Sequence, residues 1–279
     1  YYTKDVTFTG ETDTRPYNGS EQKLTGITVS GLLEGDTWTG LSYSAKGIDV
    51  GGYDGEFTGA MTLANAAGNE VFYYNVILRK GKLTITANTD EVTVTITGNH
   101  DSKVYNGSEQ SVTGYTTDVG DKTINVTLDE TGKDTAKGTN ANTYHMGLKE
   151  DDFTVTSDNY SNIKVVVNDG SLEITPVTEK VTVTIEGHKG TFKYDGMEHT
   201  VTGYDVTGIS NALYTEADFT FSGTAKVKEK NASESAYPMG LDASQFANVS
   251  GNFSNVEFVV TDGEMTINPR NITIRANDN

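Results

Sequence analysis

Apolar and polar residues alternate strictly at three points of the chain. Val92-Thr93-Val94-Thr95-Ile96-Thr97 has a large apolar residue at every second position, as does Val181-Thr182-Val183-Thr184-Ile185, and Val6-Thr7-Phe8-Thr9 is a shorter version. A period of two places the apolar side chains on one face of a β-strand and the threonines on the other. Each segment is therefore predicted to be a half-buried strand that opens a structural unit.

A hexapeptide follows each alternating segment. Tyr17-Asn18-Gly19-Ser20-Glu21-Gln22 returns as Tyr105-Asn106-Gly107-Ser108-Glu109-Gln110, and in altered form as Tyr194-Asp195-Gly196-Met197-Glu198-His199, at intervals of 88 and 89 residues. A repeat of that length is a whole domain, longer than the units of solenoids. We predict three domains, residues 1–88 (divergent), 89–177 and 178–269, with 270–279 as the start of a further repeat or a linker. Asn-Gly and Asp-Gly steps favour a tight hairpin turn, with the tyrosine packed locally.

The remaining elements are also short strands. Apolar runs flank Asn168-Asp169-Gly170 and Asp262-Gly263, with Lys80-Gly81 at the comparable place in the first repeat, and these predict a closing hairpin in each repeat. No helix longer than one turn is expected. Roughly seven strands per repeat are typical of an all-β fold, here three tandem immunoglobulin-like antiparallel β-sandwich domains.

The junctions between repeats are short. Seven positions separate Ile85 from Val92 and Ile174 from Val181, and Pro176 lies in the second junction. Linkers with proline and without glycine-serine runs are stiff. We therefore expect an extended, rod-like arrangement on the order of 110 Å long.

Composition changes this picture mainly by exclusion. The net charge is −18, which disfavours nucleic acid and anionic membranes as partners. The chain has no cysteine and no apolar stretch long enough to span a membrane. These features favour an extracellular location on a bacterial cell surface, and we interpret the sequence as a segment of a larger secreted or wall-anchored protein, monomeric in solution.

Candidate chemistry is sparse. The four histidines have no metal-site spacing, and the acidic pairs and triplets, such as Glu150-Asp151-Asp152, do not follow a calcium-loop pattern. No catalytic, cofactor-binding or metal-ligating residue is expected, although weak Ca²⁺ binding stays open. Trp38, the only tryptophan, could form a platform for a sugar ring with Tyr43 and Tyr53. The alternative is that Trp38 fills the core of the first repeat.

Four short motifs carry a family resemblance. They are the Tyr-Asn/Asp-Gly step, the strand Val-Thr-Gly-Tyr at Val112–Tyr115 and Val201–Tyr204, the segments Tyr144-His-Met-Gly-Leu148 and Tyr237-Pro-Met-Gly-Leu241, and the closing Asp-Gly. Together they resemble the tandem MBG or YDG-type immunoglobulin-like repeats of Gram-positive cell-surface adhesins. The resemblance implies an extracellular β-sandwich in a long adhesin or stalk, without catalytic residues, and some such repeats are associated with mucus binding.

The expected function is a non-enzymatic stalk or adhesin segment in cell adhesion. A glycan- or mucin-binding module is the first alternative, and accessory repeats of a large secreted carbohydrate-active enzyme are another. The partners expected on this basis are host or microbial glycans, mucin or other surface proteins.

Overall fold

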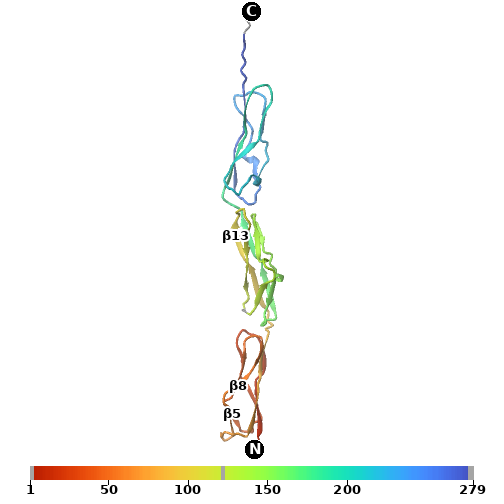
Figure 1. Ribbon diagram of the computed structural model, residues 1–279, viewed down its shortest axis with the longest axis vertical. Helices are drawn as coiled ribbons and strands as arrows, with labels where there is room; N and C mark the ends of the chain where they lie inside the picture. The colour runs from red at the N-terminus through yellow and green to blue at the C-terminus, as the bar shows by residue number, and fades with distance from the viewer. Residues whose placement is uncertain (1–2, 121–122, 276–279) are drawn as a thin grey trace. The chain divides into compact units, whose positions relative to one another are not determined.

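The computed structural model describes residues 3–120 and 123–275, and within them the chain forms strands joined by turns (Figure 1). Its helical elements are three single 3-10 turns: η1 (Glu150–Asp152), η2 (Glu216–Asp218) and η3 (Ala243–Gln245). The chain divides into two compact units. The first comprises Tyr1–Asn99, Gly114–Asp134 and Gly147–Gly170; the second comprises His100–Thr113, Thr135–Met146 and Ser171–Asn279. The second sequence repeat contributes to both units, so the division into three domains stays a prediction.

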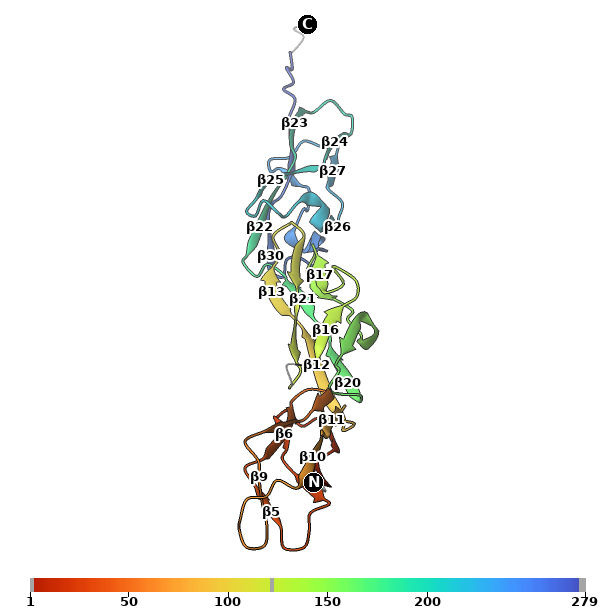
Figure 2. The same cartoon turned by 60° about the horizontal axis from the view of Figure 1, so that its bottom comes forward.

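The first unit holds the whole first repeat and part of the second. The first-repeat strands are β1 (Lys4–Gly10), β2 (Asp13–Pro16), β3 (Gln22–Leu24), β4 (Ile27–Ser30), β5 (Thr37–Thr39), β6 (Ser42–Gly47), β7 (Gly51–Asp54), β8 (Glu56–Thr58), β9 (Thr62–Ala64), β10 (Tyr74–Arg79) and β11 (Lys82–Thr86). The second-repeat strands here are β12 (Val92–Gly98), β15 (Tyr115–Asp118), β16 (Asn125–Leu128), β19 (Phe153–Thr156) and β20 (Ile163–Asn168). Figure 2 shows β12 and β20 as neighbours.

The second unit holds the rest of the second repeat and the third. Its second-repeat strands are β13 (His100–Val104), β14 (Gln110–Thr113), β17 (Thr135–Gly138), β18 (Asn142–His145) and β21 (Ser171–Thr175). Its third-repeat strands are β22 (Val181–Gly187), β23 (Lys189–Lys193), β24 (His199–Thr202), β25 (Tyr204–Ile209), β26 (Phe219–Phe221), β27 (Lys226–Glu229), β28 (Tyr237–Pro238), β29 (Phe246–Asn248), β30 (Val256–Thr261) and β31 (Glu264–Asn268).

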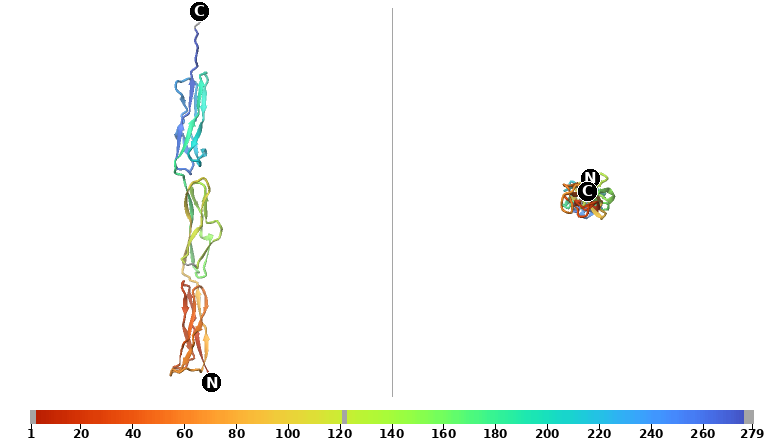
Figure 3. Two further views of the ribbon diagram at one scale, coloured as in Figure 1. Left: turned by 60° about the vertical axis from the view of Figure 1, so that its left-hand side comes forward. Right: turned by 90° about the horizontal axis from the view of Figure 1, so that it is seen from below.

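One strand pattern occurs three times. The alternating strand is central in the sheets β10-β1-β4, β20-β12-β15 and β30-β22-β25, and the last strand is central in β2-β11-β7, β13-β21-β18 and β23-β31-β28. Most apolar residues of the alternating strands, among them Phe8, Ile96 and Ile185, are fully buried, as their period of two predicts. The all-β, immunoglobulin-like β-sandwich expected from the sequence is thus confirmed (Figure 3).

The strand pairing differs from the expectation in one respect. The alternating strand runs antiparallel to one neighbour, for example β1 to β4, but parallel to the other, β1 to β10. The same parallel pair recurs as β12 with β20 and β22 with β30. The sheets are therefore mixed, because the opening strand and the penultimate strand of each repeat run in the same direction.

The predicted closing hairpins are wrong. β20 pairs with β12, whereas β21 pairs with β13 and β18, so the chain crosses at Asp169-Gly170 from one sheet to the other. The end of the opening strand lies directly against this crossing point. A Cβ atom on Gly98 would be only 2.4 Å from the Gly170 amide nitrogen, so a side chain does not fit there. Gly187 and Gly263 repeat this arrangement at 2.2 Å. The glycine of the Asp-Gly step allows two backbones to approach closely and does not supply a hairpin turn.

The Tyr-Asn/Asp-Gly step is a turn but not a tight hairpin, because the strands on either side of it pair with other strands. Gly19, Gly107 and Gly196 have φ of 76°, 77° and 81°, while no residue other than glycine has a positive φ in the part that the structure describes. The side-chain oxygen of Asn18 accepts the amide of Ser20 at 3.0 Å. The same bond forms in the other repeats at 2.9 and 2.8 Å. This is an Asx turn, in which only the glycine needs the left-handed conformation.

Candidate functional site

The most elaborate recurring contacts lie where one repeat meets the next, and the first unit contains one such junction. Asn159 extends from the second repeat and is buried, with 3% of its surface exposed. Its Oδ1 accepts the Val50 amide and its Nδ2 donates to Asp49 Oδ1, both at 2.9 Å. A single asparagine therefore satisfies a donor and an acceptor of the first repeat, which an apolar residue at this position could not do.

Backbone hydrogen bonds add to this contact. The Asn88 amide donates to the Asn159 carbonyl at 2.8 Å, and the Ser161 amide donates to the Asn88 carbonyl at 3.0 Å. The ring of Tyr17, from the recurring turn, meets the ring of Tyr160 edge-on at 5.5 Å. Tyr17 is 4% exposed. The sequence predicts only local packing for the turn tyrosine, but its ring also packs across the junction.

The second unit contains the same junction between the second and third repeats. Asn252 Oδ1 accepts the Ala141 amide at 2.6 Å, and its Nδ2 donates to Asn140 Oδ1 at 3.1 Å. The ring of Tyr105 meets that of Phe253 edge-on at 5.6 Å.

The backbone bonds of this junction also match those of the first. The Val177 amide donates to the Asn252 carbonyl at 2.9 Å, and the Ser254 amide donates to the Val177 carbonyl at 3.0 Å. The two junctions thus use the same bonds at equivalent positions.

Sequence reasoning missed these residues, although a signal was present. Asn159-Tyr160-Ser161-Asn162 and Asn252-Phe253-Ser254-Asn255 form an Asn-aromatic-Ser-Asn loop just before the penultimate strand of each repeat. We call this segment the junction loop. The first repeat has Glu70-Val71-Phe72-Tyr73 at this place, so it has no junction loop of this type. Its glutamate cannot donate the second hydrogen bond that the asparagine amide supplies.

The Met-Gly-Leu and Asp-Gly motifs form one structural unit. Asp169 accepts the amides of Gly147 and Leu148 at 3.1 and 2.9 Å, and Asp262 accepts the corresponding amides of Gly240 and Leu241 at 3.0 and 2.7 Å. A carboxylate that accepts two backbone amides fixes the turn strongly.

The first repeat replaces this carboxylate by a cation. Lys80 stands at the aspartate position and forms an ion pair with Glu56 at 2.5 Å. The first repeat thus lacks both the aspartate and the Met-Gly-Leu segment whose amides that aspartate accepts in the other repeats. Tyr53 is nonetheless the equivalent of Tyr144 and Tyr237, since the three lie opposite Leu83, Leu172 and Met265.

The three candidate sugar-binding residues do not form one platform. Tyr43 is 3% exposed, and its hydroxyl donates to the Glu11 carbonyl at 3.0 Å. Tyr53 lies in the sheet with β11, where its hydroxyl donates to the Asp49 carbonyl. Trp38 is half-buried and meets Phe8 edge-on at 5.3 Å. Trp38 and Tyr43 line one open depression of about 480 Å³ together with Lys23, and Tyr53 is not part of it.

Tyrosine hydroxyls tie a loop of the first repeat in place. The Asp36 carboxylate accepts from Tyr73 at 2.6 Å and from Tyr74 at 2.5 Å. The bond from Tyr73, followed by that from Tyr74, lowers the pKa of Asp36, while the same contact raises the pKa of Tyr73 to about 12. Near neutral pH the Asp36 carboxylate is therefore ionised and both tyrosines are neutral, so these hydrogen bonds hold the Asp36 loop in place.

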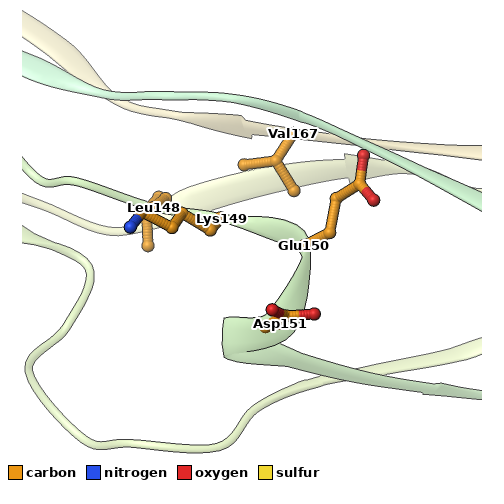
Figure 4. Close-up of a pocket in the computed structure, with 5 residues that line it drawn as sticks. All are labelled: Leu148, Lys149, Glu150, Asp151 and Val167. Atoms are coloured by element: carbon orange, nitrogen blue, oxygen red, sulfur yellow. The ribbon is translucent and has the colours of Figure 1, made fainter.

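The acidic segments do not converge. Glu150-Asp151-Asp152 forms η1, where Asp152 accepts the Lys149 amide at 2.7 Å, and in Figure 4 the carboxylates of Glu150 and Asp151 point in different directions. Among residues 3–120 and 123–275, no group of three or more histidine, aspartate or glutamate side chains could hold a metal ion. Weak Ca²⁺ binding stays a prediction. No helix in the described ranges is long and apolar enough to cross a membrane.

Comparisons with known proteins leave the family open. No family model matches the sequence, and no curated protein matches it. A solved structure described as the N-terminal four Ig domains of Dscam1 isoform 9.44, with zinc, matches at 10% identity over 95% of this chain and 73% of that one. The TM-score of this match is 0.20. The fold assignment therefore rests on the strand pairing of the chain itself.

Proposed function

We propose that this chain is a non-enzymatic spacer segment of an extracellular surface protein, in which consecutive repeats are held in a fixed orientation. The observation that carries the proposal is the junction built twice from the same bonds, around Asn159 and around Asn252. Two hydrogen bonds through one asparagine, backbone bonds on both sides and an aromatic contact restrain more degrees of freedom than a flexible linker would. A spacer needs this restraint to keep its ends apart.

The biological setting of this proposal comes from the sequence motifs. The Tyr-Asn/Asp-Gly, Met-Gly-Leu and Asp-Gly motifs resemble MBG or YDG-type repeats, which favours a stalk or adhesin on a Gram-positive cell surface. The net charge of −18 is compatible with that role, because it keeps neighbouring copies apart in solution. Accessory repeats of a secreted carbohydrate-active enzyme would require the same spacer property.

Small-angle X-ray scattering of the chain tests the spacer role. We expect a maximum dimension on the order of 110 Å. The expected radius of gyration lies well above the about 19 Å of a compact globule of this length. A compact particle, or a profile typical of freely hinged repeats, would refute the spacer role.

Glycan binding by the first repeat is a second candidate, favoured by the depression that Trp38 lines. An indole face beside hydroxyls and Lys23 suits the apolar face and the hydroxyl groups of a sugar. On a glycan array, binding by the native chain should be lost in Trp38→Ala. Trp38→Phe is the matched control for packing against Phe8, and binding that survives Trp38→Ala, or its absence in the native chain, excludes this role.

A further inference from the structure

In the first two repeats, the turn tyrosine and the amide of Val50 or Ala141 form the surface that contacts the junction loop of the next repeat. The third repeat has the same surface, and no other part of the described chain covers it. The amide of Tyr194 donates to the Asn268 carbonyl at 2.9 Å, as that of Tyr17 donates to Thr86 at 2.8 Å. The turn tyrosine is thus held in the same way at both places. Its exposure differs, since Tyr17 is 4% exposed against its neighbour and Tyr194 is 38% exposed.

The polar part of the surface is also present. The Tyr237 hydroxyl donates to the Asn231 carbonyl at 3.1 Å, just as Tyr144 donates to Asn140 at 3.0 Å. This bond positions the following residue, so Ala232 is the equivalent of Ala141. In the part of the chain that the structure describes, the Ala232 amide has no hydrogen-bond partner, whereas the Ala141 amide is held by Asn252.

The chain beyond this surface also has an apolar pattern without a partner. Ile272 and Ile274 alternate with polar residues, and they are 80% and 87% exposed. Ile274 follows Ile267 by seven positions, as Val181 follows Ile174, and Val181 is only 1% exposed. Large apolar side chains this exposed at alternating positions are typical of a segment that packs against a partner.

We propose that the end of the third repeat formed by Tyr194, Ala232 and Arg270 is a docking surface for another immunoglobulin-like repeat that carries a junction loop and follows in tandem. Arg270 occupies the position of Asn88 and Val177. The backbone amide and carbonyl of those two residues form hydrogen bonds with the junction loop. The loop asparagine would accept the Ala232 amide, and its aromatic residue would cover Tyr194. This inference rests on the proposed spacer role and names the partner that lengthens the spacer.

The occupant is defined by what the surface requires. It must present an acceptor to the Ala232 amide, a donor beside Asn231 and a ring to Tyr194, which the junction loop does at both known junctions. A second copy of the chain cannot supply these groups by docking its first repeat onto this surface. Its first repeat has Glu70 and Phe72 in place of the asparagine and serine, and its own junction loops are already engaged.

The test is a lengthened chain, in which residues 1–273 are followed by a second copy of residues 181–279. Amide hydrogen exchange is measured at Val50, Ala141 and Ala232 in the native and the lengthened chain. We expect exchange at Ala232 to slow by roughly tenfold on lengthening, the effect of one new hydrogen bond. Asn252→Ala together with Phe253→Ala in the added copy alone should abolish that slowing.

The outcomes separate the two proposals. If Ala141 and Val50 are protected but Ala232 is not, the docking surface is refuted and the spacer role stands. If none of the three amides is protected, the spacer role fails as well. Protection at the core strand β22 of the added copy shows that it has folded, and a second version that adds residues 92–175 instead replaces it if it has not.

Discussion

Replacing Asn159 by alanine will weaken the junction between the first and second repeats. The Val50 amide and the Asp49 carboxylate both lose their partner at 2.9 Å in a site where Asn159 is buried. Because a buried donor without an acceptor costs more than an average hydrogen bond contributes, we expect the free energy of opening this junction to fall by about 2 kcal/mol. The expected result is roughly 30-fold faster hydrogen exchange at Val50.

The other junction provides the control within the same molecule. The Ala141 amide, held by Asn252, should exchange in Asn159→Ala as it does in the native chain. Asn162→Ala is a matched surface variant, because its side chain makes only a 3.3 Å bond to the Thr89 carbonyl. If Val50 exchanges at the native rate in Asn159→Ala, the asparagine does not hold the junction and the spacer proposal loses its main support.

Replacing Asp262 by alanine will destabilise the third repeat. The carboxylate accepts the amides of Gly240 and Leu241, and Gly240 has a φ of 81° that this turn maintains. Hydrogen bonds to a charged acceptor contribute more than neutral ones, so we expect a loss of about 2–3 kcal/mol in the free energy of unfolding. Urea denaturation followed by circular dichroism, with hydrogen exchange at Leu241, measures the loss.

Asp262→Asn distinguishes charge from shape. It keeps one acceptor oxygen in place and should recover part of the stability lost in alanine. Exchange at Leu148, whose amide Asp169 holds in the second repeat, should remain native in both variants. Equal stability of native and Asp262→Ala would show that the recurring Asp-Gly step matters only through its glycine.

The fold class followed from local pattern, whereas the strand connections did not. Alternation in Val92–Thr97 and Val181–Ile185 predicts one buried face, and Val94, Ile96 and Ile185 are buried as expected. The Asp-Gly step predicts a hairpin because such steps favour tight turns. Here Gly170 and Gly263 have no positive φ, and they are needed for close approach to Gly98 and Gly187. A close contact between distant segments leaves no local signature.

The candidate site illustrates the same limit. Aromatic residues near turns suit sugar binding, which is why the sequence suggests Trp38, Tyr43 and Tyr53 as one platform. Tyr43 is buried, however, and Tyr53 does not line the depression that Trp38 lines. The sequence does not mark the junction loop, because Asn-Tyr-Ser-Asn is ordinary loop composition when considered alone. Only its placement against Asp49 and Val50 gives the asparagine a defined role.

The sequence by itself determined the all-β class and the three occurrences of one strand pattern, because a period of two and a returning hexapeptide are properties of the chain alone. Tertiary structure decided which strands pair, where the chain crosses between sheets and which residues join one repeat to the next. These features depend on hydrogen bonds between residues about 70 to 110 positions apart, such as Tyr17 with Thr86 and Val50 with Asn159. These pairs depend on how distant segments pack against each other in three dimensions, and a local sequence pattern does not contain that information.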